Sequence, residues 1–188
     1  DLDAHLGHRT EHFRAHVLHR VLRRDGEIAA LGADAVAEVA AARADELCVV
    51  VPAQPNPEVS EAVRDRLSNI PGVALVEPLD YRTMVALLSA GRMVVTDSGG
   101  LQEEAPALGL PVLVLREKTE RPEGVAAGGV ELVGTDPDAI KRGIERILDS
   151  PADAAVGSEC SSPYGDGLAS ARVSDALMGR RPTQFRPQ

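Results

Sequence analysis

The stretch RMVVTDSGGLQEEAPALG, residues 92–109, connects an apolar segment to a helical one through a serine and two glycines. Residues 92–96 are typical of a short buried strand, and residues 99–108 are predicted to form a helix that Gly109 ends. Ser98 stands where a helix N-cap is expected. A strand that leads directly into a helix is half of a β-α-β unit, so this stretch favours a parallel sheet.

The same alternation continues in both directions from this stretch. Further strands are predicted at residues 47–51, 73–76, 112–115 and 130–133, and further helices at residues 29–44, 57–69, 81–90, 137–148 and 168–178. Short connections between near-continuous apolar strands imply right-handed crossovers, with helices on both faces of the sheet. The sequence therefore predicts an α/β fold with a doubly wound parallel sheet.

The composition argues against several classes of protein. The 188 residues are 44% hydrophobic, which is enough for the core of one ordinary domain. The net charge of −9 and the aromatic content of 2% argue against binding to nucleic acid or to an anionic membrane surface. No window approaches the ~20 apolar residues of a membrane span.

The two cysteines and the first residue add two expectations. Cys48 and Cys160 form neither a disulfide framework nor a CxxC metal spacing, so a cytoplasmic location is expected. The chain begins with Asp1 rather than Met, so we expect a fragment, or a processed or separately encoded piece.

The turn between the predicted strand and helix at residues 92–108 has the chemistry of a phosphate cradle. Gly99 and Gly100 allow backbone N–H groups to approach an anion, Ser98 adds a hydroxyl donor, and the helix dipole favours negative charge. Glu104 lies one turn into the helix and can accept hydrogen bonds from a ribose diol. The alternative is a simple serine cap on a tight turn with acidic residues in the first turns of the helix.

Two further segments are candidates for the same edge of the sheet. Residues 116–123 (REKTERPE) carry six charges directly after a strand and can supply a guanidinium for phosphate. The alternative for them is a solvated loop with internal ion pairs. Residues 162–167 (SPYGDG) form either a ligand-touching loop or only a sharp turn before the last helix.

All five histidines fall within the first 19 residues. If that stretch were helical, the spacings of His5, His8, His12, His16 and His19 would place them on one face. Such a face can hold zinc, but no cysteine ligand lies beside it and no third ligand follows. We therefore expect a solvated face with one or two functional members, and no metal site.

The motifs SGGLQEEAP (residues 98–106), TERPE (119–123) and PYGDG (163–167) occur together in this order, with PNP (55–57) and PLDY (78–81) before them. The combination resembles the C-terminal domain of the non-hydrolysing UDP-N-acetylglucosamine 2-epimerases, which have the two-domain glycosyltransferase-B architecture. The similarity is dense from about residue 49 to residue 177. It implies a UDP-binding, Rossmann-like domain over residues 49–178, after a poorly matching helical segment over residues 1–48 and before a disordered tail over residues 179–188.

The resemblance also implies an activity. The family interconverts UDP-GlcNAc and UDP-ManNAc by eliminating UDP to give 2-acetamidoglucal, and then adds UDP back after C2 is protonated on the opposite face. No metal or other cofactor is implied, the partner is a UDP-sugar, and a homodimer is expected because the family commonly forms dimers.

Individual roles follow from the same resemblance. Residues implied to contact UDP are Ser98, Gly99 and Gly100 at the diphosphate, Glu104 at the ribose, Arg121 at the leaving nucleotide, and Leu79 and Met84 near uracil. Leu79 would act through its main chain, and Met84 stands where the family usually has a phenylalanine. The segment GHRTE (residues 7–11) resembles the family's Gly-His-Arg-Arg-Glu, which assigns His8 as the active-site histidine, with Arg9 nearby.

The carboxylates that exchange the C2 proton are not found in this chain. In the family they come from the N-terminal domain, and epimerisation needs acid and base groups on both faces of C2. We therefore expect this chain to bind UDP, and to turn over only with an N-terminal domain supplied in cis or by a partner chain. The alternatives are a non-catalytic or degenerate UDP-sugar-binding domain, a hydrolysing 2-epimerase, or another enzyme of the glycosyltransferase-B class.

Overall fold

Six parallel strands form one sheet at the centre of the molecule. The computed structural model describes residues 15–20, 26–151 and 163–185. The strands are β1 (Ala15–Arg20), β2 (Leu47–Pro52), β3 (Val73–Val76), β4 (Met93–Thr96), β5 (Val112–Val114) and β6 (Val130–Leu132). Their order in the sheet is β3-β2-β1-β4-β5-β6, and every adjacent pair is parallel. This is the doubly wound order of the Rossmann fold, so the predicted fold class is confirmed.

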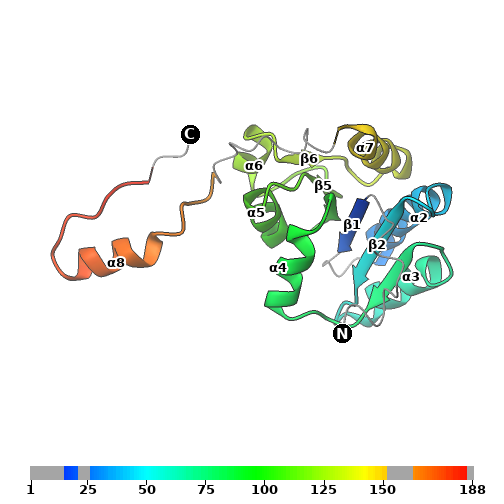
Figure 1. Cartoon of the computed structure of the whole chain (residues 1–188), viewed down its shortest axis with the longest axis horizontal. Coiled ribbons are helices and arrows are strands. Elements are labelled where there is room, and N and C mark those ends of the chain that lie inside the picture. Colours follow the sequence, from blue (N-terminus) through cyan, green and yellow to red (C-terminus); the bar gives the residue numbers. More distant parts are fainter. Residues whose placement is uncertain (1–14, 21–25, 152–162, 186–188) are drawn as a thin grey trace.

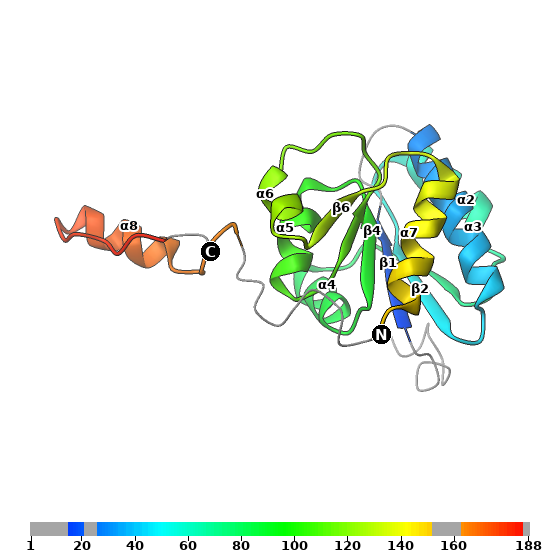
Figure 2. The same cartoon turned by 90° about the horizontal axis from the view of Figure 1, so that it is seen from above.

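Helices cover both faces of the sheet (Figures 1 and 2). They are α2 (Gly26–Ala42), α3 (Pro57–Leu67), α4 (Tyr81–Ser89), α5 (Gly99–Ala107), α6 (Pro122–Ala126), α7 (Pro137–Asp149) and α8 (Ala169–Leu177). In Figure 2, α2, α3 and α7 lie on one side of the sheet, and α4, α5 and α6 lie on the other. The helix α8 extends away from this body (Figure 1) and buries none of its residues.

Alternating strand residues supply the two cores. Val49 and Val95 pack with α2, α3 and α7 in one cluster, whereas Val50 and Val94 pack with α4 and α5 in the other. The strand β4 is buried along its whole length, which agrees with the continuous apolar run of a strand covered on both faces. Within the described residues, no helix is long and apolar enough to cross a bilayer.

The helix starts follow the local sequence. The N-caps Asn56, Asp80, Ser98 and Asp136 each accept a hydrogen bond from a backbone N–H of the first turn of their helix. In α3 and α7 the cap is followed by proline, whose missing N–H costs nothing at the first helical position. The helix starts predicted at residues 57, 81, 99 and 137 are confirmed, because the caps and prolines that fix them are local in the sequence.

Two elements differ from the sequence-based expectation. Residues 1–48 were expected to be a helical segment; α2 lies within it, but Ala15–Arg20 forms the strand β1, paired on both sides with β2 and β4. His16 and His19 therefore lie on a strand, so the helical condition for one shared histidine face is not met at these two residues. The second difference is α6, which begins inside the segment interpreted as a charged loop.

The strand order also identifies the binding edge. The chain passes outward from β1 through β2 to β3, and then returns to place β4 on the other side of β1. At such a switch point the loops after two adjacent strands separate and leave a crevice at the carboxyl edge of the sheet. The register pairs Arg20 with Thr96, so the turn that follows Thr96 begins at this edge.

Candidate functional site

The turn after β4 is fixed by hydrogen bonds within it. The Thr96 hydroxyl accepts from the Ser98 N–H at 3.0 Å, and the Ser98 hydroxyl accepts from the Leu101 N–H at 3.4 Å. The Gln102 N–H donates back to the Ser98 carbonyl at 3.3 Å. These bonds use the N–H groups of Leu101 and Gln102, and they leave the first N–H groups of the helix, on Gly99 and Gly100, for an anion.

Two carboxylates flank the two glycines. Glu120 Oε1 lies 3.0 Å from the position that a β-carbon on Gly99 would take, and Glu104 Oε1 lies 3.5 Å from the corresponding position on Gly100. A side chain at Gly99 would therefore crowd the Glu120 carboxylate, whereas a β-carbon at Gly100 would meet Glu104 at ordinary van der Waals distance. The structure places Ser98, Gly99, Gly100 and Glu104 together, as the sequence predicted.

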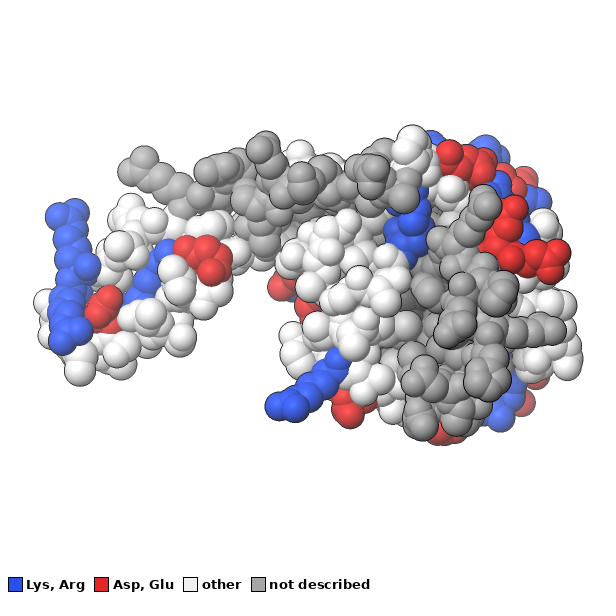
Figure 3. All heavy atoms as spheres, viewed as in Figure 1, with Lys and Arg blue, Asp and Glu red and all other residues white. Residues whose placement is uncertain are grey.

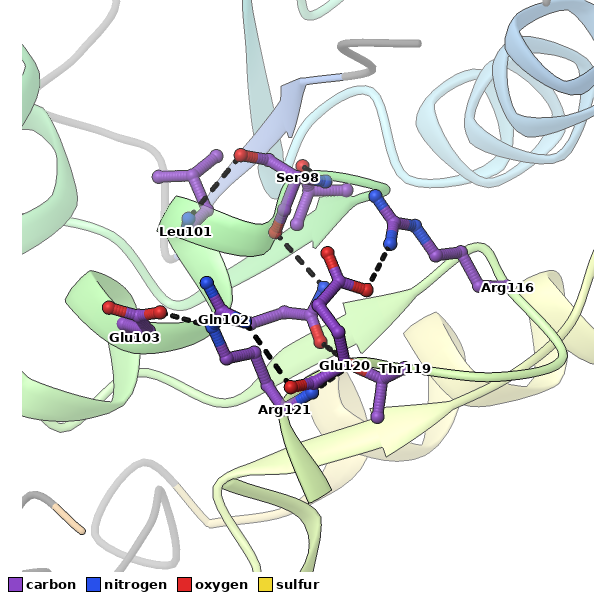
Figure 4. A network of polar contacts seen from close by, with 9 residues as sticks. Ser98, Leu101, Gln102, Glu103, Arg116, Thr119, Glu120 and Arg121 are labelled. Atoms are coloured by element: carbon purple, nitrogen blue, oxygen red, sulfur yellow. Dashed lines mark hydrogen bonds and ion pairs between the residues drawn. The ribbon is translucent and has the colours of Figure 1, made fainter. Parts of the chain in front are cut away.

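The loop after β5 brings two guanidinium groups to the same turn (Figure 4). Arg116 Nη1 donates to Glu120 Oε2 at 2.7 Å, and Arg121 Nε donates to Glu103 on the second turn of α5. The hydrogen bond and charge of Glu103, followed by the charge of Glu120, raise the pKa of Arg121 above its ordinary value. A hydrogen bond from its own backbone N–H, assisted by Arg116 and Arg121, lowers the pKa of Glu120. Both arginines are thus held at this edge by carboxylates.

Gln102 ties the two loops together, a role that the sequence analysis missed. Its side chain is fully buried; Nε2 donates to the Ser98 carbonyl at 3.1 Å, and Oε1 accepts from the Thr119 hydroxyl at 2.5 Å. The Thr119 hydroxyl in turn accepts from the Arg121 N–H at 3.0 Å. A glutamine four residues after Ser98 returns to the N-cap on the same helix face, and that spacing is the signal in the sequence.

An open cleft of about 550 Å³ lies at the carboxyl edge beside these residues. Asp97, Leu115, Arg116, Lys118 and Glu120 are among the residues that line it. Asp97 is almost completely buried, and Arg116 keeps only 12% of its side chain exposed. Ile28 and Glu117 line it as well, so the cleft combines apolar surface with charged side chains of both signs, two of them cationic.

The PYGDG segment reaches this region through Tyr164. Its hydroxyl lies 2.5 Å from the position of a β-carbon on Gly124, inside α6, so only glycine fits there. Asp166 instead makes a bidentate ion pair with Arg172, with both distances 2.6 Å, and accepts from the Leu168 N–H at 3.1 Å. The side-chain hydrogen bonds from Arg172 hold the pKa of Asp166 well below its usual range. The segment is therefore a turn that starts α8, with Tyr164 anchored beside the site.

The anchored tyrosine gives a prediction about pH. Burial raises the pKa of Tyr164, so the folded chain keeps the phenolic proton at a pH where the unfolded chain has lost it. Stability should therefore fall as the pH rises above about 10, the ordinary tyrosine pKa. Thermal unfolding between neutral and alkaline pH checks this, together with tyrosinate absorbance. Tyr164→Phe should remove this part of the alkaline loss of stability, and an unchanged profile would contradict the assignment.

Four of the predicted residues are not brought to this turn by the described structure. Met84 is 5% exposed and packs in the core beneath α4, so it presents almost no surface to a base. Leu79 follows β3 at the same edge of the sheet, but it packs partly against the same core. His8 and Arg9 lie outside the described residues. The roles of all four stay predictions.

The described residues contain no group of three or more histidine, cysteine, aspartate or glutamate side chains that could hold a metal ion. His5, His8 and His12 lie outside them. Figure 3 shows positive and negative side chains interspersed on the body of the molecule, with basic side chains gathered at the far end of the segment that carries α8. The turn after β4 thus combines backbone N–H groups at a helix start with ion-paired arginines, an arrangement that suits an anion.

Comparison with known proteins points in the same direction. Residues 3–178 match the family model described as UDP-N-acetylglucosamine 2-epimerase. Proteins of that name from Salmonella typhimurium and from Escherichia coli K12 are 46% and 43% identical over 147 residues, which is 78% of this chain and 39% of each relative. The chain thus spans about two fifths of the length of these relatives.

Solved structures show the same relationship. The UDP-GlcNAc 2-epimerase of Neisseria meningitidis bound to UDP-GlcNAc has a TM-score of 0.79 and 36% identity, over 88% of this chain and 45% of that one. A co-structure of Staphylococcus aureus MnaA with UDP has a TM-score of 0.86 and 32% identity, over 98% of this chain and 53% of that one. The matched part is therefore about half of each structure.

Proposed function

The chain belongs to the UDP-N-acetylglucosamine 2-epimerase family, and from that premise we propose that it supplies the UDP-binding half of an enzyme interconverting UDP-GlcNAc and UDP-ManNAc. The observation that carries the proposal is the turn from Ser98 to Gly100, with its open helix N-terminus at the switch point of the sheet. Two similar structures were solved with UDP or UDP-GlcNAc bound, which supports this ligand class for the cleft.

We infer that the residues described here act on the leaving group. UDP departs carrying the negative charge of its diphosphate, and the N–H groups of Gly99 and Gly100, with Ser98 and Arg121, stabilise that charge. Glu104, whose carboxylate lies beside Gly100, would accept from the ribose. Stabilising the departing diphosphate lowers the barrier to elimination, and the same contacts hold UDP for its return.

We propose that the proton transfer at C2 needs a further domain. Glu103 and Glu120 are engaged with arginines, which supports assigning them to the nucleotide side. The exposed apolar residues of α8 and its ends, among them Val173 and Leu177, also fit a second domain that covers them. Four expectations stay predictions: a UDP-sugar as ligand, an N-terminal domain supplied in cis or by a partner chain, a homodimer, and a cytoplasmic location.

Calorimetric titration with UDP tests the proposal, with ADP as the control nucleotide. We expect saturable binding that prefers UDP and no epimerisation by this chain alone. Adding the missing domain should then yield UDP-ManNAc; free ManNAc would instead indicate a hydrolysing enzyme. Failure to bind UDP even with that domain present would favour a degenerate module.

Arg121→Ala tests the charged loop within the same assay. Losing a charge-assisted contact to phosphate should weaken UDP binding by about 1.5–3 kcal/mol. Arg64→Ala is the matched control, because Arg64 is an exposed arginine on α3 without an ion pair among the described residues. Equal UDP affinities of the two variants would indicate that residues 116–123 form a solvated loop that does not contact UDP.

A further inference from the structure

We propose that Glu120 is an internal competitor for the diphosphate, and that Arg116 exchanges Glu120 for phosphate when a nucleoside diphosphate binds. This rests on the proposed UDP site and deepens it by adding two residues that set its affinity. Neither residue was assigned a role by the sequence motifs alone.

The position of the Glu120 carboxylate is the first observation. One oxygen, Oε1, lies beside Gly99 at the start of α5, and the other, Oε2, accepts from Arg116 at 2.7 Å. Figure 4 shows the side chain between Arg116 and the turn at Ser98. An anion therefore already stands where the positive end of α5 and a guanidinium converge.

The state of Arg116 is the second observation. Its Nε is buried and has no hydrogen-bond partner among the described residues, although Nη1 is paired with Glu120. The guanidinium is therefore already largely desolvated and keeps donor capacity for a second acceptor. A diphosphate in the cleft can satisfy that capacity, because phosphate oxygens accept from the two edges of one guanidinium.

The Glu120 carboxylate and a bound diphosphate would repel each other if both stood beside Arg116 and the start of α5. About half of the Glu120 side chain is exposed, so it can rotate into solvent at small cost, whereas Arg116 is fixed beneath it. Binding of diphosphate would then replace one carboxylate by a group of higher charge at the same donors. The ion pair keeps Arg116 in place before binding, and Glu120 reduces the affinity for the nucleotide.

Glu120→Gln removes the charge and keeps the shape, and is the direct test by calorimetry with UDP at low salt. We expect binding to tighten by roughly 3- to 10-fold, the size of one screened charge repulsion near a surface. Glu61→Gln is the matched control, because it removes an equal charge from an exposed position on α3, away from the residues that line the cleft. That variant should change the affinity by less than about twofold.

Two further measurements separate this role from a purely structural one. The gain in UDP affinity from Glu120→Gln should shrink at ~0.5 M salt, because salt screens the repulsion between Glu120 and the diphosphate. A gain that came from a change in loop geometry would not depend on salt in this way. Arg116→Gln should weaken UDP binding by about tenfold, as expected for loss of one charge-assisted contact. Circular dichroism confirms that each variant is folded.

The outcomes distinguish this inference from the proposed function. If the wild-type chain binds UDP but Glu120→Gln binds equally or more weakly, the competitor role is overturned and the UDP site stands. If the wild type does not bind and Glu120→Gln does, the competitor role is supported. Absence of binding by both variants, even with the N-terminal domain present, would overturn the two together.

Discussion

Gly99→Val is expected to abolish UDP binding while the domain remains folded. A β-carbon at this position would point at the Glu120 carboxylate, 3.0 Å away, and its branches would fill the opening that phosphate needs. The contacts at risk are charge-assisted hydrogen bonds from backbone N–H groups, each worth about 1.5–3 kcal/mol. Losing two of them corresponds to a loss of more than roughly 100-fold in affinity.

The same geometry explains why the fold should survive. The nearest atom is the end of a flexible, half-exposed side chain, which can move away. The backbone of Gly99 does not have a positive φ, so a β-branched residue is not strained there. Valine is also a better helix former than glycine, so the free energy of unfolding should change by less than about 1 kcal/mol.

Ala107→Val provides the matched control for that prediction. It adds a branched side chain at an exposed position at the other end of the same helix, α5. Urea unfolding and calorimetry with UDP are measured on both variants. Normal UDP binding by Gly99→Val would show that the cradle lies elsewhere, and loss of binding in both variants would indicate a general disturbance of the helix.

Most of the sheet could be predicted from sequence because its strands are apolar on both faces. The runs at β2, β4 and β5 are fully buried, so the local pattern and the tertiary environment agree. The helix starts were predictable for a similar reason, since caps such as Asp80 and Asp136 act within one turn of the chain.

The strand β1 could not be predicted in the same way. Its residues, AHVLHR, mix histidine and arginine with only two large apolar side chains, and its strand state depends on pairing with β2 and β4. Paired residues of β1 and β2 are 32 positions apart (47 − 15 = 32, for Ala15 and Leu47), and those of β1 and β4 are 76 apart (93 − 17 = 76, for Val17 and Met93). Tertiary pairing therefore overrides the local pattern here.

The helix α6 was a different kind of omission. Pro122 and Glu123 provide a first-turn proline and an acidic residue, which are typical of a helix start. The charge of the surrounding segment suggested a solvated loop instead. The consequence matters for the site, because α6 carries Gly124, against which Tyr164 packs.

The turn at Ser98 was predictable from the sequence, whereas the ion pairs around it were not. Ser98 and the two glycines form the turn that the sequence indicated, whereas the ion pairs of Arg116 and Arg121 depend on how two separate loops approach. Residue identity alone cannot show that an arginine is already paired with a carboxylate. That fact changes the expected effect of a mutation, since removing the carboxylate can strengthen binding.

Gln102→Met is expected to lower both stability and UDP affinity, because it breaks the buried connection between the two loops. The fully buried side chain of Gln102 serves the Ser98 carbonyl and the Thr119 hydroxyl. Methionine has similar length and volume and can make neither bond. Leaving buried polar groups with one partner fewer should cost about 1–3 kcal/mol in the free energy of unfolding.

The effect of Gln102→Met on UDP binding follows from the hydrogen bond between Thr119 and Arg121. The Thr119 hydroxyl accepts from the Arg121 N–H, so the loop that presents Arg121 is held through Gln102. When the connection is lost, Arg121 must be ordered upon binding, and UDP affinity should fall by about tenfold, since ordering one flexible side chain costs about 0.5–1.5 kcal/mol.

A double-mutant cycle with Thr119 identifies the connection as the cause. Thr119→Val removes the hydroxyl with little change in shape, whereas Thr119→Ser keeps it and serves as the conservative control. If Gln102 and Thr119 act as one unit, the double variant Gln102→Met/Thr119→Val should be less destabilised than the sum of the single variants. Simple additivity in both unfolding and UDP binding would show that the two side chains act independently, and that the position of Arg121 does not depend on Gln102.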